Sequence, residues 1–408
     1  MRTLIALLEG AFRYLGWWLQ AATAWRDPRA PLGPRRLLVL LAGVPLFLVV
    51  QAVHGLCLLL DELLYPGYRR QPVGRALFIT GIPRSATTFV HRTLAADTAR
   101  FRTPGAWEVA VAPAICQRRL IRRLGRLDAR LGGYGQRALA GALRRLAGGL
   151  DAIHPVELDA PEEDYLALLP AGGCFIALLA FPAAAGLQGL SCFPERLSAG
   201  RQQRLLACYE RCLQRQLYDG APGTVLLSKN AALGSWTPAL YERFPQARFL
   251  ICLREPRSAL SSQVSSVGAA RALGVAVDRP AFQRLLLDAY AGSLAHLAEL
   301  AERDTRSRVA VVDTGDLRVA PERVLGAALE RLAALPGVRM VRSDYGYRRR
   351  AGSVTRSTLA CEGAASSTHR NMAMAAVLFS MGGTPSPLSW AVDSAGSRPS
   401  RRLRPAGG

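Results

Sequence analysis

The chain has 408 residues, and 50% of them are hydrophobic, which is enough apolar material for the core of a large folded domain. This composition excludes a chain that is disordered throughout. The formal net charge of +22 favours phosphate-bearing ligands, nucleic acid or an anionic membrane surface as partners. Charge alone does not choose among these three.

Lysine and cysteine are used in unusual ways. Lys229 is the only lysine in a chain with 52 basic residues. The 8 cysteines are dispersed, with no C-x-x-C pair and no histidine cluster nearby. We therefore expect no metal site and no disulfide framework.

An uncharged apolar run begins at Leu37 and ends at Leu60. Its length matches the roughly 20 residues that a membrane-spanning helix needs. The alternative is an interfacial helix kinked at Pro45. Upstream, apolar residues between Leu4 and Leu19 fall on one helical face, as in a helix that lies in a membrane interface. We predict that residues 1–66 are a membrane-associated segment with an apolar helix at 37–60, whose flanking arginines leave its orientation open.

After Pro66, short apolar runs alternate with stretches of helical periodicity. Buried strands are predicted at Ala76–Thr80, Thr224–Leu227, Phe249–Leu253 and Val309–Val312. Helices are predicted at Ser85–Ala96, Trp236–Phe244, Arg257–Ser266 and Pro321–Ala334. This alternation implies an α/β domain over residues 67–340, with a parallel sheet flanked by helices. Residues 341–408 lose all periodicity and predict a poorly structured tail, with Met372–Met381 as the exception.

The segment Phe78–Phe89 predicts an anion-binding loop, because an apolar strand runs through small polar residues into a helix. Arg84 and the hydroxyl groups of Ser85, Thr87 and Thr88 add hydrogen-bond donors there. The loop is P-loop-like, yet Ala86 and Thr87 stand where a Walker A motif has its second glycine and its lysine. A magnesium–triphosphate site is therefore poorly supported.

A second anion site is expected where the run Phe249–Leu253 ends at Arg254. Arg254 at the strand end and Ser262 within the next helix could face one phosphate. Between the two anion sites along the chain, the apolar run Thr224–Leu227 leads to Lys229.

These motifs resemble those of bacterial membrane-associated sulfotransferases, whose 5′-phosphosulfate loop reads P-R-S-G-T-T before L-H-R-x-L-A. The chain has Pro83-Arg84-Ser85-Ala86-Thr87-Thr88, then Val90-His91-Arg92-Thr93-Leu94-Ala95. The family's 3′-phosphate motif, R-x-P with a serine eight residues after the arginine, matches Arg254, Pro256 and Ser262. The resemblance covers about residues 60–335. It implies transfer of a sulfuryl group from 3′-phosphoadenylyl sulfate (PAPS) to a hydroxyl of a carbohydrate, lipid or small molecule, with no metal and no nucleic acid partner.

The resemblance also implies roles for individual residues. Lys229, in a strand end like the family's L-S-K-N, would point towards the sulfuryl group and neutralise charge together with Arg84. Glu108, in Ala106-Trp107-Glu108, is the first choice for the base that accepts the hydroxyl proton, and the alternatives are His154, Glu162 and Glu163. Ala86 replaces the glycine of the family, and alanine would be strained by about 1–2 kcal/mol if this position has positive φ.

Two other interpretations stay open from the sequence. One is a P-loop-type kinase, and the other is a membrane protein that binds the nucleotide without turnover. The arginines between Arg118 and Arg126 favour a helix face exposed to solvent, and contact with a membrane surface is the second interpretation. The expected location is the bacterial inner membrane, and donor supply favours a catalytic domain on the cytoplasmic side.

Overall fold

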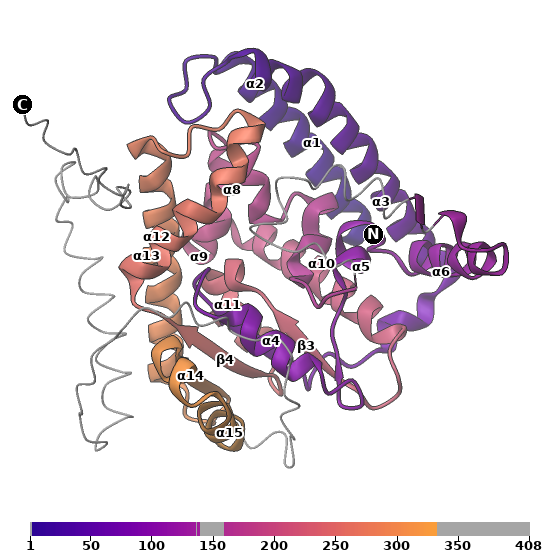
Figure 1. The fold of residues 1–408 in the computed structure, drawn as a ribbon, viewed down its shortest axis with the longest axis vertical. Helices are drawn as coiled ribbons and strands as arrows, with labels where there is room; N and C mark the ends of the chain where they lie inside the picture. Colours follow the sequence, from indigo (N-terminus) through magenta and orange to yellow (C-terminus); the bar gives the residue numbers. More distant parts are fainter. Residues whose placement is uncertain (1, 136, 139–158, 333–408) are drawn as a thin grey trace, which may run out of the picture.

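A computed structural model describes residues 2–135, 137–138 and 159–332 of the chain (Figure 1). At its centre is a parallel sheet of five strands in the order β2-β3-β1-β4-β5. The strands are β1 (Leu77–Gly81), β2 (Phe101–Arg102), β3 (Val225–Lys229), β4 (Arg248–Leu253) and β5 (Val309–Asp313). The predicted α/β fold with a helix-flanked parallel sheet is confirmed.

Strand β1 lies between β3 and β4 and pairs with both. Ile79 lies opposite Lys229 on one side and opposite Leu250 on the other. All of β1 is buried, as expected for a parallel sheet covered on both faces. The carboxyl ends of these three strands therefore meet at one edge of the sheet.

Alternate side chains of the strands enter two separate cores, because successive residues of a strand point to opposite faces. Phe78 and Phe249 belong to the larger core, and Leu77 and Leu250 belong to the smaller one. The larger core is built with α10 (Ala199–Tyr218), α11 (Thr237–Arg243) and α13 (Pro280–Arg303). The smaller core is built with α4 (Thr87–Ala95), α14 (Thr314–Val319) and α15 (Pro321–Arg331).

Other helices and turns connect these layers. Within the described residues, the other α-helices after β2 are α5 (Ala106–Ala110), α6 (Ile115–Arg130), α8 (Ala185–Gln188), α9 (Phe193–Arg196) and α12 (Pro256–Ser266). The 3-10 turns are η2 (Pro66–Arg70), η3 (Asp164–Ala171), η4 (Phe175–Leu179), η5 (Gly189–Ser191), η6 (Ala231–Trp236) and η7 (Val267–Leu273).

The four predicted strands and four predicted helices are all present, with ends that differ by a few residues. Sequence reasoning missed the two-residue strand β2 and the long helices α10 and α13. His154, the tail 341–408 and the helix expected at Met372–Met381 lie outside the described residues.

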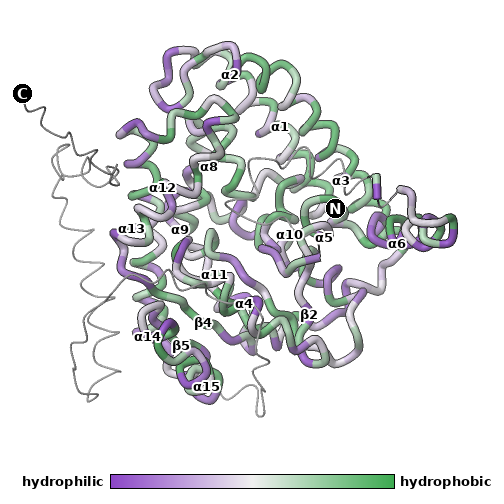
Figure 2. The backbone as a smooth tube through the Cα atoms, in the orientation of Figure 1, coloured by the Kyte–Doolittle hydropathy of each residue, from purple (hydrophilic) through white to green (hydrophobic). Residues whose placement is uncertain are grey.

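The N-terminal segment forms helices that lie against the domain. Helix α1 (Arg2–Thr23) is followed by α2 (Pro34–Leu38), the π-helical turn η1 (Val39–Gly43) and α3 (Val44–Leu64). The last three form one helix from Pro34 to Leu64 that is long and apolar enough to cross a membrane. Figure 2 shows this helix as a mainly hydrophobic band along the edge of the molecule.

These N-terminal helices share the core of the α/β domain. Tyr14, Trp17, Leu40 and Val44 belong to the same hydrophobic core as Phe78 of β1. The burial of such side chains contributes about 1.5–3 kcal/mol each. The N-terminal segment is therefore packed as part of the folded body.

A buried ion pair fixes the carboxyl end of α3. Asp61 is fully buried and accepts hydrogen bonds from the backbone N–H groups of Ile115 at 2.7 Å and Cys116 at 2.9 Å. Its carboxylate also accepts a 3.0 Å hydrogen bond from Nε of Arg215, which is itself buried in α10. Because a buried charge without a partner is strongly destabilising, this contact ties α3 to both α6 and α10.

We predict that Asp61→Ala lowers the free energy of unfolding by about 3 kcal/mol, since it leaves the buried Arg215 with Glu62 as its remaining carboxylate partner. Urea unfolding followed by circular dichroism measures this change. The matched control is Asp278→Ala, which breaks an exposed ion pair with Arg271 and should change little. Equal effects of the two substitutions would contradict the anchoring role of Asp61.

Candidate active site

The loop between β1 and α4 has the backbone shape of an anion-binding loop. Gly81 has a φ of 152°, and a Cβ at this position would lie 2.3 Å from the carbonyl oxygen of Cys252 in β4, so the close approach requires glycine. Helix α4 begins at Thr87 and has no side-chain cap. The N–H groups of its first turn are therefore open to an anion.

Two contacts hold the loop in place from inside. Ser85 is completely buried, and its hydroxyl donates a 2.6 Å hydrogen bond to the carbonyl oxygen of Ile82. The hydroxyl of Tyr290 in α13 donates a 3.0 Å hydrogen bond to the carbonyl oxygen of Pro83. The Ser85 hydroxyl, expected from the sequence to meet the ligand, thus donates within the loop.

Arg84, Arg254 and Ser262 lie together although 178 residues separate the first from the last. Nε of Arg84 donates a 3.0 Å hydrogen bond to the hydroxyl of Ser262, and Arg254 donates a 3.1 Å hydrogen bond to the carbonyl oxygen of Arg84. Helix α12 starts just after Arg254, and the Glu255 side chain caps it through the N–H groups of Arg257 and Ser258. The two anion sites expected from the sequence are therefore adjacent in space.

Lys229 ends β3 at the same edge of the sheet and is only 4% exposed. Its ammonium group lies 2.7 Å from a carboxylate oxygen of Glu163 and 3.7 Å from one of Glu162. Asn230, the residue after Lys229, is bonded to β1, because its backbone N–H donates a 2.9 Å hydrogen bond to the carbonyl oxygen of Ile79. Lys229 is thus held beside the anion-binding loop between β1 and α4 and close to the carboxylates of Glu162 and Glu163.

A buried polar network supports this lysine–carboxylate pair from below. Asn230 donates from its side-chain amide to the carboxylate of Asp164 and to the hydroxyl of Tyr209, the latter at 2.6 Å. Tyr209 donates a 2.7 Å hydrogen bond to the same carboxylate, and burial raises the pKa of Asp164 to about 6 despite these donors. Because Asp164 follows Glu163 and Asn230 follows Lys229, the network fixes both partners of the pair. The Leu-Ser-Lys-Asn strand end was the one sequence signal for it.

His91, in α4, lies near Lys229 as well. It is fully buried, and its Nε2 is 2.7 Å from the hydroxyl of Thr103. Burial lowers the pKa of His91 well below its usual value, and the nearby charges of Lys229 and Arg92 lower it further. The imidazole is therefore neutral at neutral pH and adds no charge to the site.

Glu108, the base favoured from the sequence, is held by two arginines. It is 3% exposed, and its carboxylate accepts hydrogen bonds from Arg102 at 2.7 Å and Arg122 at 2.6 Å. Both carboxylate oxygens are thus occupied by arginine donors, and little of the side chain is open to an acceptor hydroxyl. These contacts favour a positioning role for Glu108 over the proton-accepting role that the sequence suggested.

The structure brings most of the expected residues to one edge of the sheet. Those that meet there are Pro83, Arg84, Ser85, Ala86, Thr87, Thr88, Lys229, Arg254 and Ser262. Among the described residues, no group of three or more His, Cys, Asp or Glu side chains is placed to hold a metal ion.

Comparison with known proteins gives the family of this chain. A model of the sulfotransferase family matches residues 76–334, which contain every element of this edge. The chain belongs to the sulfotransferase family. A sequence search of curated proteins gives no match.

Solved sulfotransferase structures share the fold. A sulfotransferase (STF1) from Mycobacterium tuberculosis H37Rv superposes with a TM-score of 0.58 at 17% identity, covering 80% of this chain and 83% of that chain. A sulfotransferase (STF9) from Mycobacterium avium superposes with a TM-score of 0.54 at 18% identity, covering 78% and 83%. At these identities the likeness shows the fold alone.

Ala86 has a φ of 65°, so the strain expected from the missing glycine is present. We predict that Ala86→Gly raises the free energy of unfolding by about 0.5–1 kcal/mol. Relief of about 1–2 kcal/mol of left-handed strain exceeds the loss from the greater freedom of glycine in the unfolded chain. Thermal and urea unfolding measure the change.

The control is Ala327→Gly at an exposed position of helix α15, where the same substitution should lower stability by about 0.5–1 kcal/mol. A loss of stability in both variants would contradict the strained geometry of the loop.

Proposed function

We propose that this protein transfers a sulfuryl group from PAPS to a hydroxyl group of an acceptor. The observation that carries the proposal is the convergence of two separate anion sites and a buried lysine at one edge of the sheet. A donor with a 5′-phosphosulfate and a 3′-phosphate needs two such sites. A nucleoside triphosphate would instead need the lysine that Thr87 replaces, which argues against a P-loop-type kinase.

In the proposed binding mode, the 5′-phosphosulfate meets the open N–H groups of α4 and the side chain of Arg84. Arg254 and Ser262 bind the 3′-phosphate, and the 3.0 Å contact between Arg84 and Ser262 keeps the two anion sites in a fixed relation. Helix N-termini and arginines both favour phosphate and sulfate oxygens.

The proposed reaction is an in-line transfer. The acceptor oxygen attacks sulfur and forms the new S–O bond while the bond from sulfur to the bridging phosphate oxygen breaks. The acceptor proton passes to a carboxylate, and adenosine 3′,5′-bisphosphate leaves. Lys229 and Arg84 neutralise the charge that grows on the bridging and equatorial oxygens, so positioning and electrostatics supply most of the catalysis.

We assign the base to Glu163. Its carboxylate is the nearest to Lys229, at 2.7 Å, and it is partly exposed, so an acceptor hydroxyl can reach it. Glu162, at 3.7 Å from the same ammonium group, is the neighbouring alternative. Glu108 is enclosed by Arg102 and Arg122 and is almost completely buried, so an acceptor hydroxyl has less access to it. The role of His154 as an alternative base stays a prediction from the sequence.

The proposal includes association with a membrane, with the catalytic domain on the cytoplasmic side where the donor nucleotide is made. The apolar helix Pro34–Leu64 supports this part of the proposal. A carbohydrate, a lipid and a small molecule are all suitable acceptor classes. Donor binding without any transfer would support the non-catalytic alternative.

The first test concerns the donor. We predict that adenosine 3′,5′-bisphosphate binds more tightly than adenosine 5′-phosphate, and that Arg254→Ala weakens the bisphosphate by about 1.5–3 kcal/mol, the size of a lost charged hydrogen bond. Isothermal titration calorimetry measures both affinities. Arg306→Ala is the control, because this exposed arginine precedes β5 at the opposite edge of the sheet. Equal affinity for the two nucleotides would refute the 3′-phosphate site.

The second test concerns the chemistry. We predict that Lys229→Arg lowers the transfer rate by about 10²–10³-fold while donor affinity stays nearly constant, because a wide planar guanidinium cannot replace a compact ammonium group at one bridging oxygen. Mass spectrometry of a hydroxyl acceptor incubated with PAPS measures the rate. Activity within about threefold of the parent protein would make Lys229 a structural residue only.

Two isosteric variants identify the base in the same assay. Glu163→Gln should stop transfer, and its stability loss should be limited because Glu162 remains 3.7 Å from Lys229. Glu108→Gln should retain transfer and mainly lower stability by leaving Arg102 and Arg122 without their carboxylate. The reverse pattern would return the role of base to Glu108.

A further inference from the structure

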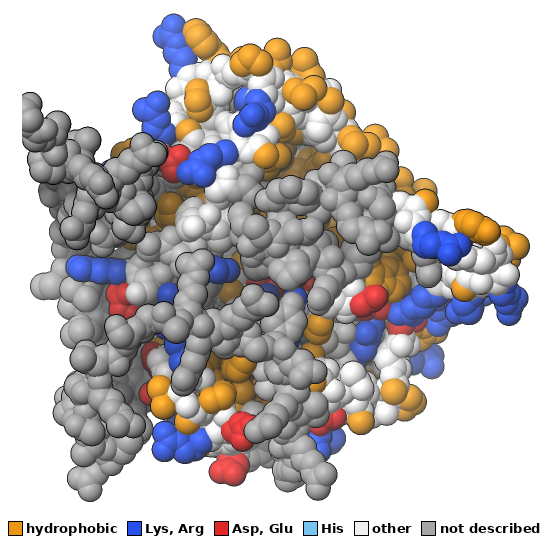
Figure 3. Space-filling model, in the orientation of Figure 1, with side chains coloured by type: hydrophobic (Ala, Val, Ile, Leu, Met, Phe, Trp, Pro, Cys, Tyr) orange, Lys and Arg blue, Asp and Glu red, His pale blue; other side chains and the backbone are white. Residues whose placement is uncertain are grey.

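The exposed apolar surface of the molecule is concentrated on its N-terminal helices and on α6. We call this surface the apolar face, and its members include Leu8, Phe12, Leu41, Val49, Leu124 and Leu127. Helix α3 contacts both α1 and α6, so the face is continuous over the three helices. Figure 3 shows hydrophobic side chains along this edge of the molecule, over the region that Figure 1 labels α2, α3 and α6. Extended exposed apolar surfaces of this kind mark sites of association.

Both ends of the helix Pro34–Leu64 are fixed to the same folded domain. At the amino end, the buried Arg36 donates hydrogen bonds to the carbonyl oxygens of Ala180 at 2.7 Å and Leu273 at 3.1 Å. At the carboxyl end, Asp61 pairs with the buried Arg215. A helix that crossed a bilayer would carry its ends to opposite sides of about 30 Å of hydrocarbon, and one domain on one side could not hold both.

The inner side of this helix carries polar residues among its apolar ones, which also argues against insertion. Gln51, His54 and Asp61 are buried against the domain, and Nδ1 of His54 lies 2.9 Å from the side-chain nitrogen of Gln117 in α6. A spanning helix would expose these groups to hydrocarbon or require new partners for them.

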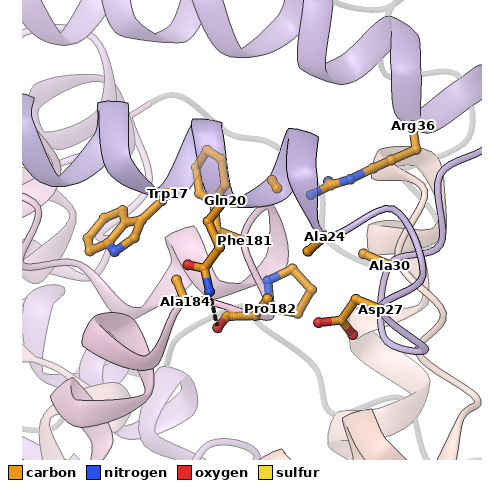
Figure 4. A pocket seen from close by; sticks show the side chains of 11 residues that line it. Trp17, Gln20, Ala24, Asp27, Ala30, Arg36, Phe181, Pro182 and Ala184 are labelled. Carbon is orange, nitrogen blue, oxygen red and sulfur yellow. Dashed lines mark hydrogen bonds between the residues drawn. The ribbon is translucent and has the colours of Figure 1, made fainter.

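Helix α1 lies beside the helix Pro34–Leu64 and is also fixed to the domain. Figure 4 shows Trp17 and Gln20 of α1 and Arg36 of α2 above Pro182 and Ala184. The side-chain amide of Gln20 donates a 3.3 Å hydrogen bond to the carbonyl oxygen of Ala183. Two neighbouring helices are thus held flat on the domain, with further apolar side chains exposed on their outer sides.

Arginines lie at both ends of the apolar face. Arg26 and Arg35 are exposed near the start of the helix Pro34–Leu64, and Arg123, Arg126 and Arg130 are exposed on α6. No formal charge interrupts residues 37–60 between them. A basic rim around an apolar centre fits the surface of an anionic bilayer, where headgroups meet the arginines and acyl chains meet the apolar side chains.

We propose that the protein docks on one leaflet of an anionic membrane through the apolar face, with the helix Pro34–Leu64 in the plane of the membrane and not across it. The helix predicted to span the membrane is thereby assigned an in-plane role. The inference rests on the membrane association within the proposed function. Because vesicle binding is measured without a transfer assay, its failure leaves the proposed chemistry standing.

The experiment uses the full chain and preformed vesicles of phosphatidylcholine, with and without phosphatidylglycerol. Flotation should show binding to the anionic vesicles that weakens at high salt. Val49→Glu should lower the partition coefficient between vesicles and water at least about tenfold. An apolar side chain that enters the acyl chains on docking is replaced there by a carboxylate. Val319→Glu is the matched control, because Val319 is 83% exposed, compared with 61% for Val49, and lies on α14, outside the apolar face.

Two outcomes would overturn the proposal at this step. The first is an equal effect of Val49→Glu and Val319→Glu on vesicle binding, with circular dichroism showing that both variants are folded. The second is a lipid-free dimer that Val49→Glu converts to a monomer, because the face would then be covered by a second copy of the chain. A monomer in the absence of lipid supports the proposal.

A protease experiment separates in-plane docking from spanning. The protein carries an N-terminal epitope tag, and the membranes are vesicles from expressing cells that have the catalytic domain outside. In-plane docking places the tag and the domain on the same side, so added protease should remove the tag and digest the domain together. A protected tag with a digested domain would show a spanning helix and refute the proposal.

Discussion

Parallel pairing of β1 with both β3 and β4 is the constraint on which the candidate site depends. In a parallel sheet the carboxyl ends of neighbouring strands lie at one edge, so the loops after the three strands are neighbours in space whatever their separation in the chain. Gly81 and Lys229 end β1 and β3, Arg254 directly follows β4, and each brings a different part of an anion site. The close contact between Gly81 and the backbone of Cys252 shows how little room the pairing leaves.

Positively charged side chains gather at the same edge of the sheet, and the cost of burying them has to be compensated. A buried lysine is costly unless a carboxylate compensates it, and Glu163 supplies that compensation at 2.7 Å. The carboxylate is in turn fixed by its neighbour Asp164, whose hydrogen bonds with Asn230 and Tyr209 close a network across three segments of the chain. The geometry of the reactive side chains is therefore set by polar groups that lie one residue further along the chain.

The sequence was sufficient for the features that depend on local order. The strand–loop–helix at β1 and α4, the residues Arg254 and Ser262 and the strained Ala86 all follow from short motifs, and the structure has them. The environment of Glu108 depends on Arg102 of β2 and Arg122 of α6, and no motif shows that these arginines meet at one carboxylate. The packing of the apolar helix Pro34–Leu64 on the domain was also missed. A mean hydropathy does not record which side of a helix each residue occupies. The polar residues Gln51, His54 and Asp61 recur on one side of it, and this spacing was the available signal that the helix packs on a domain.

The single lysine gives the molecule a spectroscopic handle of its own. Growth on lysine labelled with nitrogen-15 at the side chain would place one labelled amine in the whole chain, at position 229, where the side chain is 4% exposed and paired with Glu163. One resonance would then report the charge state and the surroundings of the candidate site, without assignment of any other signal. The bias of the chain towards arginine leaves this one side-chain amine to be observed in an otherwise unmodified protein.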